Sequence, residues 1–152
     1  MTNYNELKMV LKPLIEQNEY EITILSNASA LLNDYMDNIN WVGFYLLENN
    51  ELILGPFQGH PACTNIPLNI GVCGKCATDK KTILVKNVHE FPTHIACDSA
   101  SNSEICVPMF KNGNFYGLLD IDSPTLNRFN NEDRINLEEI VKIIEDVLNN
   151  TK

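Results

Sequence analysis

The sequence predicts an α+β domain in which helices at both ends cover an antiparallel sheet. Apolar residues recur at three- and four-residue steps near the amino end and again near the carboxyl end, which is typical of amphipathic helices. Between these regions the period changes to two, and pairs of strand-like segments flank short turn sequences. The chain has 152 residues. That length fits a single domain over residues 1–152.

Two longer helices are expected, at residues 20–36 and 131–148. The apolar positions of the first are Ile22, Leu25, Ala28, Leu32 and Met36. Those of the second are Ile135, Ile140, Ile144 and Leu148, with Asn130 or Asn131 as its cap. A shorter helix precedes both, and we expect Pro13 to bend or restart it because proline has no backbone N–H.

Two hairpins are expected at the centre of the sheet. Residues 41–48 and 51–57 flank Asn49-Asn50, and residues 104–111 and 114–122 flank Asn112-Gly113. The second turn pair tolerates the positive φ angles of a tight two-residue turn. Shorter strands at 63–68 and 82–88, separated by a short helix at 72–79, complete a sheet of about six strands.

Composition excludes several classes of function. Twenty acidic and eleven basic side chains give a formal net charge of −9. This is the wrong sign for a protein that neutralises the phosphates of a nucleic acid or lies on an anionic membrane. The amino end does not resemble a signal peptide, and no apolar run approaches the length of a membrane span. We therefore expect a cytoplasmic protein with no nucleic-acid or membrane partner.

The chain has five cysteines, which is many for a reducing compartment. Their odd number argues against a static extracellular disulfide framework. Cys97 lies in HIACDSASNSEI, residues 94–105, a polar segment of small residues that we expect to form an exposed loop. An accessible thiol oxidises readily. The cysteines therefore point to redox or metal chemistry.

Cys73 and Cys76 form a C-x-x-C pair that could be a dithiol redox site or half of a zinc site. His94 and Cys97 could supply the other half. The flanking sequence is typical of a strand and a helix rather than of a zinc knuckle, so we expect no metal. Cys106 lies inside a predicted strand, and we interpret it as a packing residue.

Asp120 and Asp122 are two residues apart on a predicted strand and therefore point to the same face. Neighbouring carboxylates repel one another, which is unfavourable unless a cation lies between them. The alternative is a solvated strand end. Trp41, the single tryptophan, shares a strand face with Tyr45, and core packing is the alternative for its role.

The segments NWVGFYLL, LGPFQG, GVCG, HIACD, SNSEI and GLLDIDS occur in this order in the chain. Together they resemble the free methionine-R-sulfoxide reductases, which are stand-alone GAF domains. The resemblance extends from about Tyr20 to about Leu137. That family carries three cysteines with nine and then twenty-three residues between them, and Cys63, Cys73 and Cys97 have this spacing.

The resemblance implies a GAF fold and an enzyme that reduces free L-methionine (R)-S-oxide to L-methionine. It implies that Cys97 is the nucleophile, Cys63 the principal resolving thiol and Cys73 a secondary one. The implied substrate pocket consists of Trp41, Tyr45, Glu104, Asp120 and Asp122. Thioredoxin is implied as the external reductant, and the protein is expected to form a homodimer. Cys76 and Cys106 lie outside the family pattern.

Reduction of a sulfoxide needs a thiolate at the sulfur and an acid near the oxygen. We expect one of the three pocket carboxyl groups to stay protonated, because crowding raises the affinity of at least one for a proton. The others would accept from the substrate ammonium. Attack leaves a sulfenic acid that condenses with a second thiol to a disulfide, with no bound cofactor. The alternative function is a GAF sensor for a small molecule or redox state, without catalysis.

Overall fold

The protein is described by a computed structural model that covers residues 1–95, 97 and 99–151. Within these residues the regular elements follow one another along the chain, with one 3₁₀ turn, η1. They are α1 (Tyr4–Ile15), α2 (Glu21–Tyr35), β1 (Trp41–Glu48), β2 (Glu51–Gly59), β3 (Asn65–Pro67), α3 (Gly71–Asp79), β4 (Ile83–Val85), η1 (Val88–Glu90), β5 (Ser103–Lys111), β6 (Asn114–Ser123) and α4 (Asn131–Leu148).

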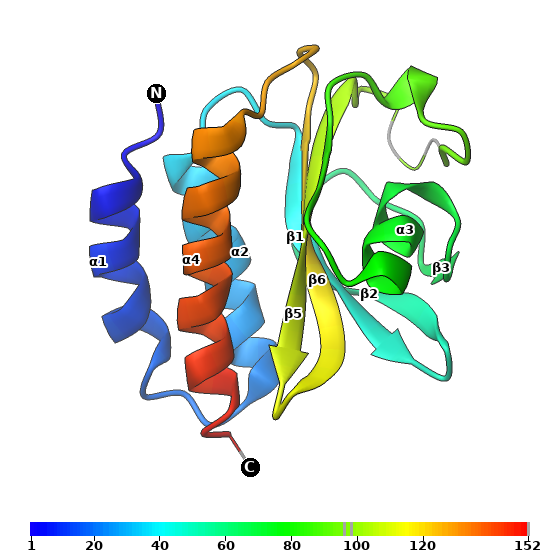
Figure 1. Cartoon of the computed structure of the whole chain (residues 1–152). Helices are drawn as coiled ribbons and strands as arrows, with labels where there is room; N and C mark the ends of the chain where they lie inside the picture. Colours follow the sequence, from blue (N-terminus) through cyan, green and yellow to red (C-terminus); the bar gives the residue numbers. More distant parts are fainter. Residues whose placement is uncertain (96, 98, 152) are drawn as a thin grey trace.

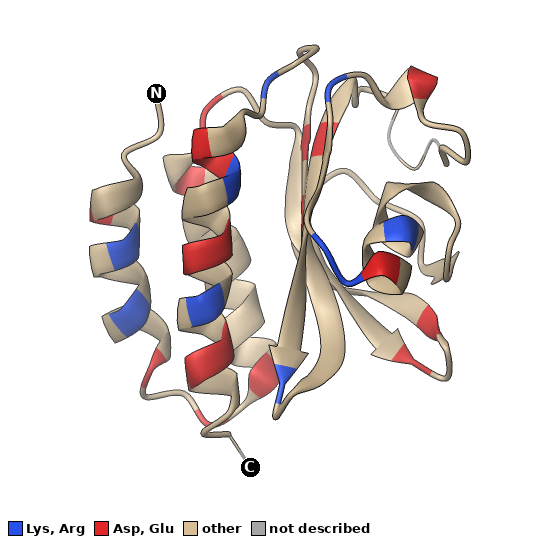
Figure 2. Ribbon diagram, in the orientation of Figure 1, with Lys and Arg blue, Asp and Glu red and all other residues tan. Residues whose placement is uncertain are grey.

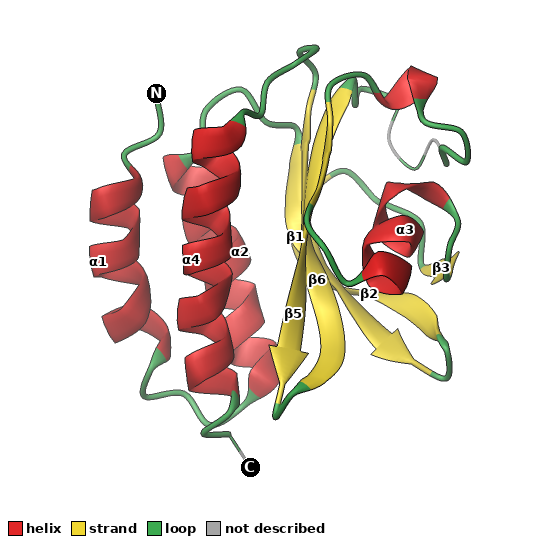
Figure 3. Cartoon of the chain, in the orientation of Figure 1, coloured by secondary structure: helices red, strands yellow, loops and turns green. Residues whose placement is uncertain are grey.

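The strands form one six-stranded sheet in the order β3-β2-β1-β6-β5-β4, and each neighbouring pair is antiparallel. Helices α2 and α4 cover one face of the sheet, and α1 packs on them as an outer layer (Figure 1). Helix α3 lies on the opposite face (Figure 3). The expected α+β fold, with terminal helices over an antiparallel sheet, is confirmed.

The helix does not restart at Pro13, which was one of the two expected effects, because α1 continues through it to Ile15. Tyr4, Leu7, Leu11 and Ile15 form the buried stripe of this helix. Pro13 lies on the exposed side. There, the carbonyl left without an N–H partner by the proline can bond to water, so the helix tolerates it near its end.

The predicted apolar positions of α2 and α4 are buried, except for one near the start of each helix. Ile22 is 68% exposed and Ile135 is 44% exposed, so neither belongs to the core. The buried positions also include Ile24 and Leu31 in α2 and Leu137 and Val141 in α4. The predicted start of α4 is confirmed: Asn130 caps it in a capping box with Asp133.

Both hairpins form at the predicted turns, where Asn49, Asn50, Asn112 and Gly113 have positive φ angles. Such angles give the two-residue turns that match the twist of antiparallel strands. The strands predicted at residues 63–68 and 82–88 are shorter in the structure: β3 covers Asn65–Pro67 and β4 covers Ile83–Val85.

Most charged side chains lie on helices and turns, but acidic residues also occur within β5 and β6 (Figure 2). These are Glu104, Asp120 and Asp122, and all three are buried. Charged side chains are rarely buried without a specific partner. The face of the sheet that carries them is therefore the candidate position of a functional site. Among the described residues, no helix has the length and apolar character needed to cross a membrane.

Candidate active site

Strand register brings the acidic residues together. Glu104 of β5 pairs with Asp122 of β6, and Cys106 pairs with Asp120. Alternate residues of a strand point to the same face, so all four side chains share the face that α3 covers. The period-two spacing correctly predicted that Asp120 and Asp122 point the same way. The alternative of a solvated strand end was wrong, because both are buried.

Aromatic side chains of β1 and β2 form the wall beside these carboxylates. The Trp41 ring stacks with Tyr45 at 5.8 Å and with Phe57 at 5.2 Å between ring centroids. Residue 43 between them must be glycine, because a Cβ there would lie 2.8 Å from Trp41 Cη2. Trp41 is thus both packed, as the alternative interpretation held, and part of the pocket wall.

A pocket with an empty volume of about 510 Å³ opens over this face. That volume includes the solvent-filled mouth of the pocket. The five residues expected to bind substrate all line it, together with Cys73 and Cys97. The other lining residues were not predicted to bind substrate, and they are Ala62, Ile66, Ile70, Gly71, Val72, His94, Ile95 and Ser101. Most are small or apolar, and their type carries no chemical signal.

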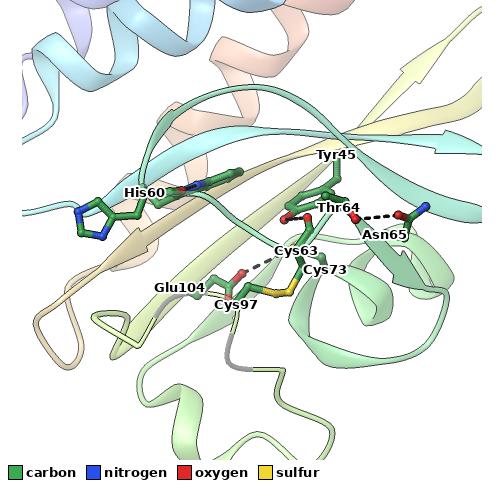
Figure 4. The surroundings of a disulfide bond; sticks show 9 residues. Tyr45, His60, Cys63, Thr64, Asn65, Cys73, Cys97 and Glu104 are labelled. Atoms are coloured by element: carbon green, nitrogen blue, oxygen red, sulfur yellow. Dashed lines mark hydrogen bonds between the residues drawn. A yellow bond between two sulfur atoms is a disulfide. The ribbon is translucent and has the colours of Figure 1, made fainter.

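A disulfide joins Cys63 to Cys97, with 5.3 Å between the Cα atoms (Figure 4). The segment around Cys63 is held against the aromatic wall by two hydrogen bonds. The Tyr45 hydroxyl donates to the carbonyl of Cys63 at 2.9 Å, and Trp41 Nε1 donates to the carbonyl of His60 at 3.2 Å. These residues therefore position the segment that carries Cys63.

Four buried side chains at and just behind the pocket floor make contact through sulfur and oxygen atoms. We call them the thiol–carboxylate cluster: Cys73, Glu104, Cys106 and Asp120. One potential ligand atom from each lies within 4.8 Å of all the others, and such donors can hold a divalent metal. Cys106 is buried, as expected for a packing residue, but its thiol also lies 3.2 Å from Asp120 Oδ1.

Burial sets the protonation of this cluster. Loss of solvation raises the pKa of Glu104 well above its ordinary value, and the neighbouring Asp120 adds to the effect. Burial and the proximity of Asp122 raise the pKa of Asp120 in the same way. The hydrogen bond with Cys106 lowers the pKa of Cys73, but burial and Glu104 outweigh it and raise this pKa to about 11. Burial therefore favours the protonated forms of these three groups on the pocket floor.

The segment before β5 is less exposed than predicted. Ser101 and Ser103 are buried, and Ser103 Oγ donates to the carbonyl of Thr125 at 2.6 Å. Cys97 is half-buried. Ala96 and Asp98 also belong to the predicted exposed loop. Both lie outside the described residues.

The alternative zinc site does not form from the residues considered in the sequence. Cys97 is bonded to Cys63 instead of pairing with His94. In the described part of the chain, the metal-competent group that contains Cys73 includes neither Cys76 nor His94. The three remaining thiols, including that of Cys76, are buried.

Comparison with known proteins places this geometry in a family. The GAF domain model matches residues 21–148. Free methionine-R-sulfoxide reductase of Escherichia coli (strain K12) is 43% identical over 148 residues, which cover 97% of this chain and 90% of that protein. Structures of fRMsr of Staphylococcus aureus in the reduced form and in complex with substrate are 58% and 57% identical, with TM-scores of 0.95 and 0.94. Each match covers 97% of this chain, and 96% and 97% of those chains. The chain therefore belongs to the GAF domain family, in the branch that contains the free methionine-R-sulfoxide reductases.

Proposed function

We propose that this protein reduces free methionine-R-sulfoxide to methionine. The observation that carries the proposal is the disulfide between Cys63 and Cys97 beside a pocket with buried carboxyl groups. A disulfide at the pocket is the oxidised product of such a reaction. Buried carboxyl groups supply the acid that the sulfoxide oxygen needs. A sensor pocket requires neither feature.

Cys97 attacks the sulfoxide sulfur as the thiolate, and a protonated carboxyl group donates to the oxygen. Glu104 and Asp120 are suited to this donation because burial favours their neutral forms. The bond between the substrate sulfur and its oxygen then breaks as the oxygen is transferred to the Cys97 sulfur, so that methionine leaves and Cys97 becomes a sulfenic acid. Cys63 then attacks this sulfur, and the oxygen departs as water. The sulfoxide has gained two electrons, and two thiols have become one disulfide.

The ends of a free amino acid match two parts of the pocket. Asp122 and the pocket carboxyl group that is not the proton donor would accept from the ammonium group. The first turn of α3 also lines the pocket, through Gly71 and Val72. The Gly71 N–H donates to Thr93 Oγ1 at 2.9 Å, but the next N–H groups of this turn have no partner within the helix and could receive the substrate carboxylate. Trp41 would lie against the S-methyl group and select one configuration at sulfur.

An external dithiol must reopen the disulfide, and we propose thioredoxin in the cytoplasm for this step. A dithiol reduces Cys63–Cys97 by exchange through a mixed disulfide. Cys73 is the candidate for a second resolving thiol, since it lines the same pocket. The reaction as written requires no resident cofactor.

The test compares the free R and S epimers of methionine sulfoxide with their N-acetylated forms, using a dithiol reductant and measuring the methionine formed. The free R epimer should be reduced. N-acetylation removes the ammonium charge and should lower kcat/KM by about 10- to 100-fold, which is the usual cost of a lost charged hydrogen bond. No methionine from the free R epimer would overturn the proposal. Equal rates for the acetylated form would overturn the role given to the carboxylates.

A further inference from the structure

The Cys106 thiol of the thiol–carboxylate cluster lies close to three polar atoms at once. Cys106 Sγ lies 3.5 Å from Cys73 Sγ, 3.6 Å from Glu104 Oε2 and 3.2 Å from Asp120 Oδ1. A thiol has a single hydrogen and can donate it to only one of these atoms at a time. A cation at the centre of the group would contact all of the donor atoms at once.

The spacing of these atoms matches the edges of a coordination tetrahedron. Cys73 Sγ, Cys106 Sγ and Glu104 Oε2 form a nearly equilateral triangle with sides of 3.5, 3.6 and 3.7 Å. A tetrahedral zinc ion with its usual bond lengths has edges of about 3.8 Å between two sulfurs and about 3.5 Å between sulfur and oxygen. Asp120 supplies the fourth donor atom. The first three side chains could therefore bind such an ion with shifts of a few tenths of an ångström. The Asp120 oxygen lies 3.2 Å from Cys106 Sγ and within 4.8 Å of the other donor atoms, so it is near enough to approach as the fourth ligand.

The pocket provides a route to this position. Cys73, Glu104 and Asp120 all line it, whereas Cys106 lies behind them, in β5. An ion that enters the pocket would contact donor atoms of these three residues, and Cys106 Sγ would complete its coordination. The two thiols that take part are not in the disulfide, so the cluster persists while Cys63 and Cys97 are oxidised.

We propose that the thiol–carboxylate cluster is a binding site for a zinc-type divalent cation, and that the bound cation inhibits the enzyme. Each thiol that ligates the ion releases its proton to solvent. The ion would then hold the carboxyl groups that face the substrate and occupy the pocket floor. Binding of the ion does not depend on the proposed function, whereas inhibition rests on it.

Cobalt(II) is the probe for binding, because thiolate ligation gives it a charge-transfer absorption in the near ultraviolet and a tetrahedral site gives strong visible bands. The titration uses protein with the Cys63–Cys97 disulfide intact, so those sulfurs cannot bind. We expect one cobalt per chain, displaced by zinc. Cys106→Val should weaken binding by more than the about 10- to 100-fold that loss of an outer-shell partner costs. Cys76→Ala, which removes a buried thiol outside the cluster, should bind as the wild type does.

Absence of a thiolate–cobalt absorption in the wild type would overturn the site. Wild-type binding by Cys106→Val, or equal loss in Cys76→Ala, would overturn it as well. If Cys106→Val does not fold, Cys106→Ser, which keeps the size but not the thiolate, must show the same loss.

Inhibition is measured separately, as the methionine released in one turnover from prereduced protein after the reductant has been removed. Zinc should suppress this release, and Cys106→Val should need at least about tenfold more zinc, in line with its weaker binding. Each variant is compared with its own rate without zinc. Cobalt binding without zinc inhibition would overturn the inhibitory role. No methionine even without zinc would count against the proposed reaction and leave the cobalt result standing.

Discussion

The Tyr45 hydroxyl donates a hydrogen bond of 2.9 Å to the backbone carbonyl of Cys63. The same side chain lines the pocket and stacks on Trp41. A residue expected only to bind substrate therefore also positions the thiol that is proposed to resolve the sulfenic acid. In the proposed reaction, substrate recognition and disulfide formation would therefore depend on the same side chain.

Tyr45→Phe should slow disulfide formation more than it slows the attack on substrate. Phenylalanine keeps the ring and its stacking but removes the hydrogen bond to Cys63, a loss of about 1 kcal/mol or about fivefold in the rate of resolution. Rapid-quench measurement of methionine release and of free thiols separates the two steps. Tyr116→Phe is the matched control, because its hydroxyl donates to Glu21 on the helical side of the protein. Equal slowing of both steps would mean that Tyr45 acts through the substrate alone.

Cys97→Ser should abolish methionine formation and leave the fold intact. Cys97 lies in a partly exposed segment outside both hydrophobic cores, and serine has nearly the same size. Methionine is measured with dithiol present, and thermal unfolding is compared under reducing conditions, so that loss of the disulfide does not confound stability. Retention of about one-tenth of the wild-type turnover would show that another thiol can attack. Cys76→Ala serves as the control for loss of a cysteine as such.

The hairpins and the cap of α4 could be predicted because their signals are local. Asn112-Gly113 adopts positive φ angles, and Asn130 meets Asp133 only three residues away. The exposure of Ile22 and Ile135 could not be predicted in the same way. Which part of an apolar helical stripe is covered depends on the elements that pack against the helix, and that packing is not encoded locally.

The residues of the candidate site also differ in whether a local pattern predicts their position. The period of a strand is enough to show that Asp120 and Asp122 share a face. Placing Glu104 and Cys106 beside them requires the register between β5 and β6, which is set once the hairpin turn is known. The contact between the thiols of Cys73 and Cys106 depends on how α3 packs across the sheet, and the sequence contains no local sign of that.

Stability should fall as the pH rises through the range in which Asp120 is held neutral. Burial and then Asp122 raise its pKa above the ordinary value of 3.8. The native state therefore binds more protons than the unfolded state above that pH. The contribution of the protonated Asp120 to stability is fully present below pH 3.8 and is lost as the pH rises through the raised pKa.

Asp120→Asn removes this ionisation, so the variant should gain stability relative to the wild type by up to about 1.4 kcal/mol per pH unit. Denaturant unfolding of the disulfide form between acidic and neutral pH measures the difference. Asp146→Asn, at an exposed position of α4, should follow the wild type. A constant difference between Asp120→Asn and the wild type across this range would show that Asp120 ionises in the folded protein as it does in the unfolded chain.

Cys63→Ser should separate the attack on substrate from recycling. If Cys63 only resolves the sulfenic acid on Cys97, prereduced variant without external reductant should still release about one methionine per active site in a burst. Turnover with thioredoxin should then fall sharply, because a sulfenic acid is not the disulfide that thioredoxin reduces. Some turnover should remain if Cys73, which lines the same pocket, takes over resolution, and Cys63→Ser combined with Cys73→Ser should remove it. Loss of the burst in Cys63→Ser itself would mean that Cys63 performs the attack, and the roles of Cys63 and Cys97 would then be exchanged.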